Sequence, residues 1–310
     1  MKSQVEISII LCSNKLDNFE NFINNILATV KHPNIIEILV ACDIEDKDFL
    51  SFCNNNNNFR IKVKCFNIYE GDLYDQHKIM SSLLSYVHKD SYYVLAMSDD
   101  MRFDTKEWDD KILQYKHLFP DDIFRLRLGW RKHFKYSDYW QCISMPENID
   151  VCTKKWRNLV GEIPCFSIDS YNQNVMFYLE NIDKFNNNFR ATRDIAVENI
   201  KMQWHDAASV DDRRILKKML KAWNISTSYK TQLIASNTAY KIYKEIRSYS
   251  GELDENFKAP KLSFLKIFFL NIYRKIFYLE YGGGGFTKKI SGKKLFSLRW
   301  LIYIYFNIRI

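Results

Sequence analysis

The stretch "YYVLAMSDDMRF", residues 92–103, runs from a fully apolar segment into two adjacent acids, Asp99 and Asp100. Continuous apolar runs of this kind are typical of a strand that is buried on both faces of a parallel sheet. Two neighbouring carboxylates at the end of such a strand repel each other unless something positive lies between them. The stretch therefore predicts a buried parallel strand whose carboxyl end holds a cation.

Similar patterns precede this strand along the chain. "VEISIILCSN" (5–14) and "IIEILVACD" (35–43) are apolar runs that end in polar residues, and "FRIKVKCFNIYE" (59–70) alternates like a third strand. Apolar residues recur at helical spacing between the first two runs and again in "QHKIMSSLLSYVHK" (76–89). Strands alternating with helices predict an α/β fold with a mostly parallel sheet flanked by helices, joined by right-handed crossovers.

Two capping-box patterns suggest where helices begin. Asp17 with Glu20 predicts the start of the first helix, and Asp104 with Glu107 predicts a helix that continues to about His117. From 120 to 160 the periodicity fades, and aromatic and cationic residues predict strands and loops near a pocket. Helical patterns return at 170–182 and from 211 to about 248.

The seven cysteines are scattered without a C-x-x-C pair, which favours reduced thiols over a disulfide framework or a zinc site. The N-terminus has only a short apolar run with Glu6 just before it, so it does not fit a signal peptide. These features predict a cytoplasmic protein.

Polar side chains follow three of the predicted strands: Ser13 and Asn14 the first, Asp43 the second, and Asp99 and Asp100 the fourth. Ligands of open α/β sheets bind beyond the carboxyl ends of the strands. One carboxylate can accept hydrogen bonds from a base or ribose, while others hold Mg²⁺ or Mn²⁺ on the phosphates. The arrangement predicts a site for a nucleotide and a divalent cation.

In order and spacing, "ISIILCSNKLDNFENFINNIL", "IEILVACDIED" and "YYVLAMSDDMRF" resemble the nucleotide-binding half of the family 2 glycosyltransferases, which have the GT-A fold. The resemblance implies that Asp43 contacts the base or ribose. It places Ser98, Asp99 and Asp100 on the D-x-D metal motif, with Asp100 as direct metal ligand and Asp99 as a ribose or water-mediated contact. Cys42 and Ser98 depart from the family pattern, and Ser98 puts strict metal dependence in doubt.

The same resemblance implies further roles. Asp169, in "PCFSIDSYNQNVMFYLE", corresponds to the catalytic base, and His205 to the histidine that completes the metal shell, with Asp206 and Glu198 as alternatives. Lys78 is a candidate phosphate contact. The implied reaction is an inverting sugar transfer from a nucleotide sugar, with UDP favoured over GDP, to a glycan or lipid-linked acceptor.

The positive charge of the chain is concentrated in its C-terminal residues. Residues 258–310 contain eight lysines and three arginines against one acid, a net +10, which leaves −2 on residues 1–257 of the chain's total +8. Aromatic residues are interleaved with these cations, and every apolar run is shorter than the ~20 residues that a spanning helix needs. This segment predicts a helical, amphiphilic extension that lies on the anionic inner face of the membrane, with the glycines at 282–285 as a hinge.

The predicted organisation therefore has four parts: a nucleotide-sugar-binding half (1–118), an acceptor-binding and catalytic half (119–210), a helical connector (211–257) and the membrane-associating tail (258–310). Nucleic acid is not an expected partner because acids, and not a basic face, follow the strands.

Several alternatives stay open at this point. Asp99 and Asp100 also fit a solvated turn that caps a helix, and Asp43 fits an ordinary loop acid. Asp169 fits an N-cap, His205 an ordinary surface or core histidine, Lys78 a solvated helix face, and the tail a helical pair packed on the domain or in a dimer interface. As a whole, the chain could be an inactive GT-A-like module, a membrane-surface binding protein or a sugar nucleotidyltransferase.

Overall fold

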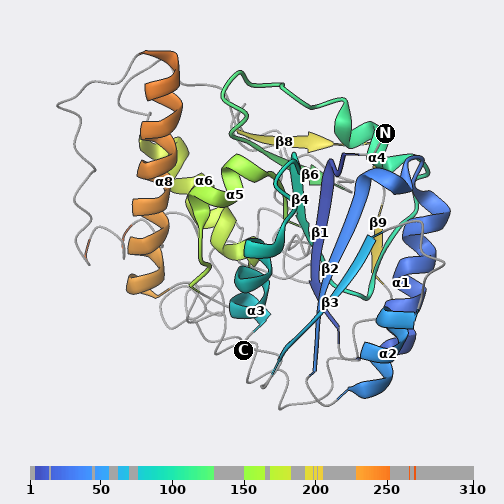
Figure 1. Cartoon of the computed structure of the whole chain (residues 1–310). Coiled ribbons are helices and arrows are strands. Elements are labelled where there is room, and N and C mark those ends of the chain that lie inside the picture. Colours follow the sequence, from blue (N-terminus) through green and yellow to red (C-terminus); the bar gives the residue numbers. More distant parts are fainter. Residues whose placement is uncertain are drawn as a thin grey trace, which may run out of the picture.

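A seven-stranded sheet with the order β3-β2-β1-β4-β7-β6-β8 runs through the centre of the computed structural model (Figure 1). The structure describes residues 4–13, 15–43, 46–55, 62–69, 76–128, 150–164, 168–182, 193–197, 199–200, 202–204, 228–251, 265 and 269. The strands of this sheet are β1 (Ile7–Cys12), β2 (Ile36–Asp43), β3 (Lys62–Tyr69), β4 (Tyr93–Ala96), β6 (Arg125–Leu128), β7 (Asp150–Thr153) and β8 (Asp194–Val197). A second, two-stranded sheet joins β5 (Met101–Phe103) to β9 (Met202–Trp204).

The central sheet is mostly parallel, as predicted. β3, β2, β1 and β4 pair side by side in parallel, and β6 pairs in parallel with β8. β7 pairs antiparallel with both β4 and β6 and so runs against its neighbours. The sequence predicted the four parallel strands, but it did not predict that β7, from the weakly patterned region, would insert beside β4.

Helices cover both faces of the sheet (Figure 1). Their bounds are α1 (Leu16–Thr29), α2 (Lys47–Asn55), α3 (Gln76–Leu83), α4 (Trp108–Leu113), α5 (Lys154–Val160), α6 (Ile168–Ile182) and α8 (Tyr229–Ser250), with short 3₁₀ turns at Pro33–Ile35 and Leu84–Tyr86. α1, α2 and α4 contribute to the core on one face, whereas α3 packs on the other. The alternation along β1 explains this, because Ile9 lies in the first core and Ile10 in the second.

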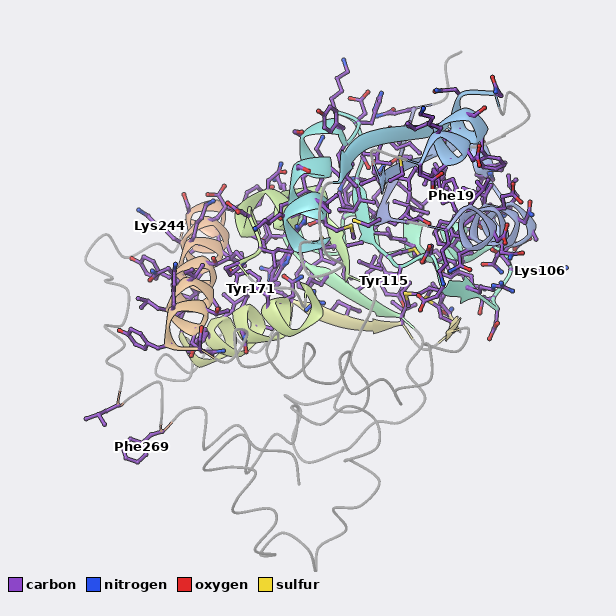
Figure 2. All side chains as sticks on the ribbon, turned by 90° about the horizontal axis from the view of Figure 1, so that it is seen from below. Phe19, Lys106, Tyr115, Tyr171, Lys244 and Phe269 are labelled. Atoms are coloured by element: carbon purple, nitrogen blue, oxygen red, sulfur yellow. The ribbon has the colours of Figure 1, made fainter. Side chains whose placement is uncertain are left out.

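Aromatic side chains dominate the core between α1 and α2. Phe19 is fully buried, and its ring centroid lies 4.9 Å from that of Phe49 on α2 (Figure 2). Full burial of such side chains stabilises each by about 1.5–3 kcal/mol relative to exposure. This packing attaches α1 firmly to the sheet beside the carboxyl end of β1.

A separate cluster lies around α5, α6 and α8. Tyr171 of α6 is buried, and its hydroxyl group lies 3.0 Å from Oγ1 of Thr238 on α8 (Figure 2). Tyr178, nearly two turns later, donates to Oε1 of Gln232 at 2.9 Å. α6 and α8 are therefore joined by apolar packing and by two buried polar contacts. The helix predicted at 170–182 is confirmed, and of the helical pattern predicted from 211 to about 248 the part from Tyr229 onward is confirmed, whereas 211–227 lie outside the described residues.

Both capping-box predictions are wrong in detail. α1 begins at Leu16, so Asp17 lies within the first turn, and the N-cap residue Lys15 makes no side-chain capping bond. An acid in the first turn is still favourable because it faces the positive end of the helix dipole. After Asp100 the chain first forms β5, and α4 covers only Trp108–Leu113. The Asp104–Glu107 pattern does not open the helix, because Glu107 has a left-handed backbone conformation with φ 59° and is itself the N-cap residue of α4.

Cys12, Cys42, Cys53 and Cys152, the cysteines whose side chains the structure describes, are free thiols, which agrees with the prediction for these four. No helix among the described residues is long and apolar enough to span a bilayer. In the predicted tail, 258–310, the structure describes Leu265 and Phe269, which are both exposed. The other residues of the predicted membrane-associating tail lie outside the described part, so its role and the four-part division stay predictions.

Candidate active site

Ser13 connects the ends of two strands that are far apart in the sequence. Its backbone N–H donates to the carbonyl of Ala41 at 2.9 Å, which continues the pairing of β1 with β2. Its side-chain hydroxyl donates to Oδ2 of Asp99 at 2.6 Å. The predicted convergence of Ser13 and Asp99 at the carboxyl ends of β1 and β4 is confirmed.

The two acids occupy the centre of a turn that directly follows β4. The carbonyl of Ser98 accepts from the N–H of Met101 at 3.2 Å, with Asp99 and Asp100 between them. Just before the turn, the N–H of Met97 donates to the carbonyl of Ile10 at 3.0 Å, so the backbone remains attached to β1. Because the turn is held at both ends, the acids are placed by backbone hydrogen bonds.

Burial gives the turn unusual acid–base properties. Desolvation raises the pKa of Asp99 above its usual range, and the charge of Asp100 raises it further. The hydrogen bond from Ser13 and the charge of Lys15 oppose this shift by lowering the pKa. Cys12, the last residue of β1, has its pKa raised to about 12 by burial and, secondarily, by the charge of Asp99. This region therefore disfavours additional negative charge unless a cation binds.

Asp100 has the feature expected of a metal ligand. Its Oδ1 atom is buried and has no hydrogen-bond partner among the described residues. A buried carboxylate oxygen is costly to leave unpaired, and a hard divalent cation prefers such oxygen ligands. No group of three or more His, Cys, Asp or Glu side chains that could share an ion is found in the described part of the chain. The donor chemistry fits Mg²⁺ or Mn²⁺, and Asp100 is the candidate protein ligand in the described part of the chain.

The second sheet ends next to the predicted metal ligand His205, which itself lies outside the described residues. β5 begins directly after Asp100 and pairs antiparallel with β9, with Met101 opposite Trp204. Met101 is the neighbour of Asp100 in the chain, and Trp204 is the neighbour of His205. The pairing therefore joins, in space, the two segments from which the metal ligands were predicted.

The remaining predicted nucleotide contacts are placed only in part. Asp43 is the last residue of β2, where the pairing with β3 shifts register, but its side chain lies outside the described part. Asn14 also lies outside it. Lys78 lies in α3 and is exposed. The roles of these three residues stay predictions.

Asp169 occupies the second position of α6. The prediction placed it at the start of a helix, and this location is confirmed, although its side chain lies outside the described part. An acid at this position faces the positive end of the helix dipole, which favours its ionised form. Because α6 begins at Ile168, Asp169 lies within the first turn and is not the N-cap residue that the alternative interpretation expected.

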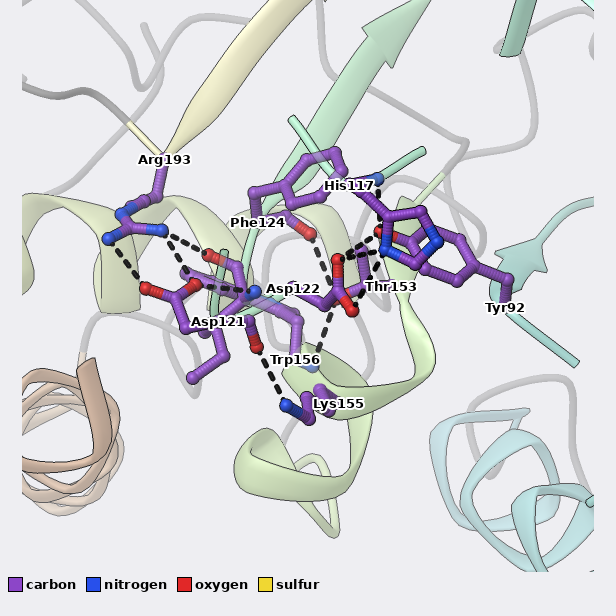
Figure 3. A network of polar contacts seen from close by, with 10 residues as sticks. Tyr92, His117, Asp121, Asp122, Phe124, Thr153, Lys155, Trp156 and Arg193 are labelled. Carbon is purple, nitrogen blue, oxygen red and sulfur yellow. Dashed lines mark hydrogen bonds and ion pairs between the residues drawn. The ribbon is translucent and has the colours of Figure 1, made fainter. Parts of the chain in front are cut away.

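A second polar cluster, which the sequence did not reveal, lies at the amino end of β4, whereas the acidic turn lies at its carboxyl end (Figure 3). The Tyr92 hydroxyl donates to Oδ1 of Asp122 at 2.5 Å and accepts from the N–H of His117 at 2.8 Å. Burial and Asp122 together raise the pKa of Tyr92. Beside it, the Arg193 guanidinium binds Asp121 through two hydrogen bonds of 2.8 and 2.9 Å. These contacts join β4, β6 and β8 at the end of the sheet opposite to the acidic turn.

Comparisons with known proteins agree with this architecture. No protein-family model matches the sequence, and no curated protein matches it. The structure is similar to that of the mannosyltransferase PcManGT from Pyrobaculum calidifontis, solved with GDP-Man and Mn²⁺, with a TM-score of 0.51 and 8% identity over 79% of this chain and 74% of that one. TarS 1-349 from S. aureus, in complex with UDP, gives a TM-score of 0.44 and 13% identity over 86% of this chain and 78% of that one. The similarity to PcManGT shows that the chain has a GT-A-type glycosyltransferase fold.

Proposed function

We propose that this protein is a glycosyltransferase that moves a sugar from a nucleotide-sugar donor to a glycan or lipid-linked acceptor with inversion at the anomeric carbon. The observation that carries the proposal is the acidic turn after β4, in which Asp100 keeps a buried carboxylate oxygen without a described partner. In a GT-A-type sheet this turn lies beyond the carboxyl ends of the strands, where ligands of such sheets bind.

Ser13 and Asp99 would face the nucleotide. The 2.6 Å bond between them leaves the second carboxylate oxygen of Asp99 free of this contact, so it can accept from a ribose hydroxyl. Asp43, at the end of β2, is the candidate contact for the base or ribose, Asn14 a further nucleotide contact, and Lys78 the candidate contact for a phosphate. The solved complex of PcManGT with GDP-Man supports a nucleotide-sugar donor in this fold.

Asp100 would hold Mn²⁺ or Mg²⁺, together with His205. The pairing of Met101 with Trp204 supports this combination because it joins the segments that carry both residues. When bound, a divalent cation stabilises the negative charge of a diphosphate leaving group. The Mn²⁺ in the PcManGT complex supports the choice of cation.

Asp169 would act as the general base. It would accept the proton of the acceptor hydroxyl as that oxygen forms its bond to the anomeric carbon and the bond to the diphosphate breaks. Its position at the start of α6 supports the role, since an acid placed there is favoured in the ionised form that a base requires.

The basic tail, 258–310, would lie on the cytoplasmic face of the membrane, beside lipid-linked acceptors. Its net +10 and its interleaved aromatic residues support this location, because each cation near an anionic leaflet contributes about 1 kcal/mol of binding. Binding of the full chain to anionic vesicles, and not to neutral ones, is the expected result.

The proposed function is tested by titration calorimetry with UDP and with GDP, each with and without Mn²⁺. We expect one nucleotide to bind in the presence of Mn²⁺ and Asp100→Ala to weaken that binding by at least roughly 10- to 100-fold. Asp104→Asn is the matched control because Asp104 is an exposed acid four residues away. Binding of neither nucleotide would overturn the site assignment and would favour an inactive GT-A-like module, for which Ser98 in the metal motif is the supporting feature.

A further inference from the structure

α1 is hydrogen-bonded to the chain that leaves the acidic turn. The side-chain amide of Asn25 donates from Nδ2 to the carbonyl of Phe103 at 3.0 Å, and its Oδ1 accepts from the N–H of the same residue at 2.9 Å. The N–H and C=O groups of one strand residue point to the same edge of the strand. The side-chain amide of Asn25 therefore bonds to Phe103, the last residue of β5, as the backbone of a neighbouring strand residue would.

Further contacts extend this attachment toward α4. The carbonyl of Thr29 accepts from the N–H of Glu107 at 2.5 Å, and its hydroxyl oxygen accepts from the indole N–H of Trp108 at 3.1 Å. The rings of Phe103 and Trp108 stack with centroids 4.1 Å apart. Among these contacts, the one made by Asn25 lies nearest to the acidic turn, with only Met101 and Arg102 between Asp100 and Phe103.

The same helix is tied to the other end of the turn. Ser13, which binds Asp99, lies three residues before Leu16, where α1 begins. α1 is a rigid element packed into the core through Phe19 and Phe22. The five residues from Asp99 to Phe103 are thus held at both ends, by Ser13 before α1 and by Asn25 within it.

Asparagine at this helical position is unfavourable in local terms, because its side chain competes for backbone hydrogen bonds. Asn21 and Asn24, on the same helix, are exposed, whereas Asn25 is half-buried and bonded to β5. The cost of asparagine in the helix is therefore offset at position 25 by a tertiary contact.

We propose that Asn25 is a positioning residue for the metal and donor site: by holding Phe103, it restricts where Asp100 can place its carboxylate. This inference rests on the proposed function. A metal ligand must keep its oxygen within a narrow range of positions, so residues that support ligands alter metal affinity without touching the ion.

The test compares Asn25→Ala with two variants of the same helix. Asn24→Ala makes the same substitution at an exposed position, and Ile23→Val shortens a buried side chain without removing either hydrogen bond to Phe103. For each protein we would measure thermal stability, amide hydrogen exchange over residues 98–103, and Mn²⁺-dependent binding of UDP and GDP by calorimetry.

We expect Asn25→Ala to accelerate exchange at Phe103 and to weaken Mn²⁺-dependent nucleotide binding by roughly 10- to 100-fold. Asn24→Ala and Ile23→Val should keep the affinity of the wild type within about a factor of two, even where Ile23→Val lowers the melting temperature as much as Asn25→Ala does. Equal affinity in Asn25→Ala and wild type, or an equal loss in Ile23→Val, would overturn the inference.

Failure of the proposed function has a different signature. In that case the wild-type protein itself binds neither nucleotide in the presence of Mn²⁺, and the positioning role falls with it. Accelerated exchange at Phe103 in Asn25→Ala would then show that Asn25 only stabilises the fold.

Discussion

The hydroxyl group of Ser13 donates a 2.6 Å hydrogen bond to Oδ2 of Asp99, although 86 residues separate the two in the sequence. The contact joins the carboxyl ends of β1 and β4, which pair in parallel. It also opposes the effect of burial on Asp99, because a donor to the ionised carboxylate lowers the carboxyl pKa that desolvation raises. This pair therefore controls both the shape and the charge of the candidate site.

Replacement of Ser13 by alanine removes the donor, so the pKa of Asp99 should rise further than it already does. If the ionised form is needed for metal and nucleotide binding, binding weakens as the pH falls through this pKa, and the midpoint of that loss should move to higher pH in Ser13→Ala. Calorimetry between pH 5 and 8 measures the shift. Ser13→Thr keeps a hydroxyl group and should follow the wild type, and coincident profiles for Ser13→Ala and wild type would contradict the prediction.

Asp99→Asn should change how stability depends on pH in the absence of metal. Because burial raises the folded-state pKa of Asp99, the unfolded chain ionises this group at lower pH than the folded protein does. Its contribution to stability is present below the unfolded pKa and is lost as the pH rises through the folded pKa. The variant should therefore melt higher than wild type at pH 7 and similarly to it in acid, whereas Asp104→Asn should show no such difference.

Two adjacent acids in α4, Asp109 and Asp110, should differ sharply in their contribution to the free energy of unfolding. Asp109 is fully buried, and its carboxylate accepts from the backbone N–H groups of Lys31 and His32 at 2.9 and 2.8 Å. Asp109→Ala leaves both donors unpaired and should lower the free energy of unfolding by about 3 kcal/mol. Chemical denaturation measures this change.

Asp110 provides the comparison. It forms a 2.8 Å pair with Lys31 at the surface, and this pair lowers the pKa of Asp110. Both side chains are well exposed, so the pair contributes little to the stability of the folded state. Asp110→Ala should unfold nearly as wild type does, and an effect as large as that of Asp109→Ala would contradict the assigned roles.

In the second cluster, substitutions in the buried pair of Asp121 and Arg193 should lower the stability of the fold most (Figure 3). Arg193 also lies over the ring of Phe119, with 4.1 Å between Cζ and the ring centroid. Arg193→Leu leaves a buried carboxylate without its cation and should cost about 3–5 kcal/mol. The double variant with Asp121→Asn should lose less than the sum of the single variants, and full additivity in denaturation experiments would show that the two do not interact.

Asp169→Asn tests the proposed base separately from the nucleotide site. The variant keeps the shape of the side chain but cannot accept a proton, so kcat should fall by roughly 10²- to 10⁴-fold. Mn²⁺-dependent nucleotide binding should stay within a factor of about two, because Asp169 is proposed to face the acceptor. Unchanged turnover would show that Asp169 is not the general base and serves only as a residue of the first turn of α6.

Much of the N-terminal half could be predicted because its signals are local. Apolar runs such as Ile7–Cys12 and helical periodicity such as Phe19 to Val30 depend on neighbours a few residues away, and they predicted β1, β2, β3, β4, α1 and α3. The acids after β4 were visible for the same reason. The weakly patterned residues from 120 to 160 gave no comparable signal, and there β7 inserts antiparallel beside β4.

The sequence by itself determined the order of buried strands and covering helices, and it placed acids where parallel strands end. Only the tertiary structure decided how those acids are held, because, apart from the bond between Ser98 and Met101 that closes the turn, the contacts that hold them join segments far apart in the chain. β5, which no local pattern predicted, forms because Met101 pairs with Trp204 and Phe103 binds Asn25. Three residues carry too little local preference to choose a conformation, so backbone hydrogen bonds to distant partners make the choice.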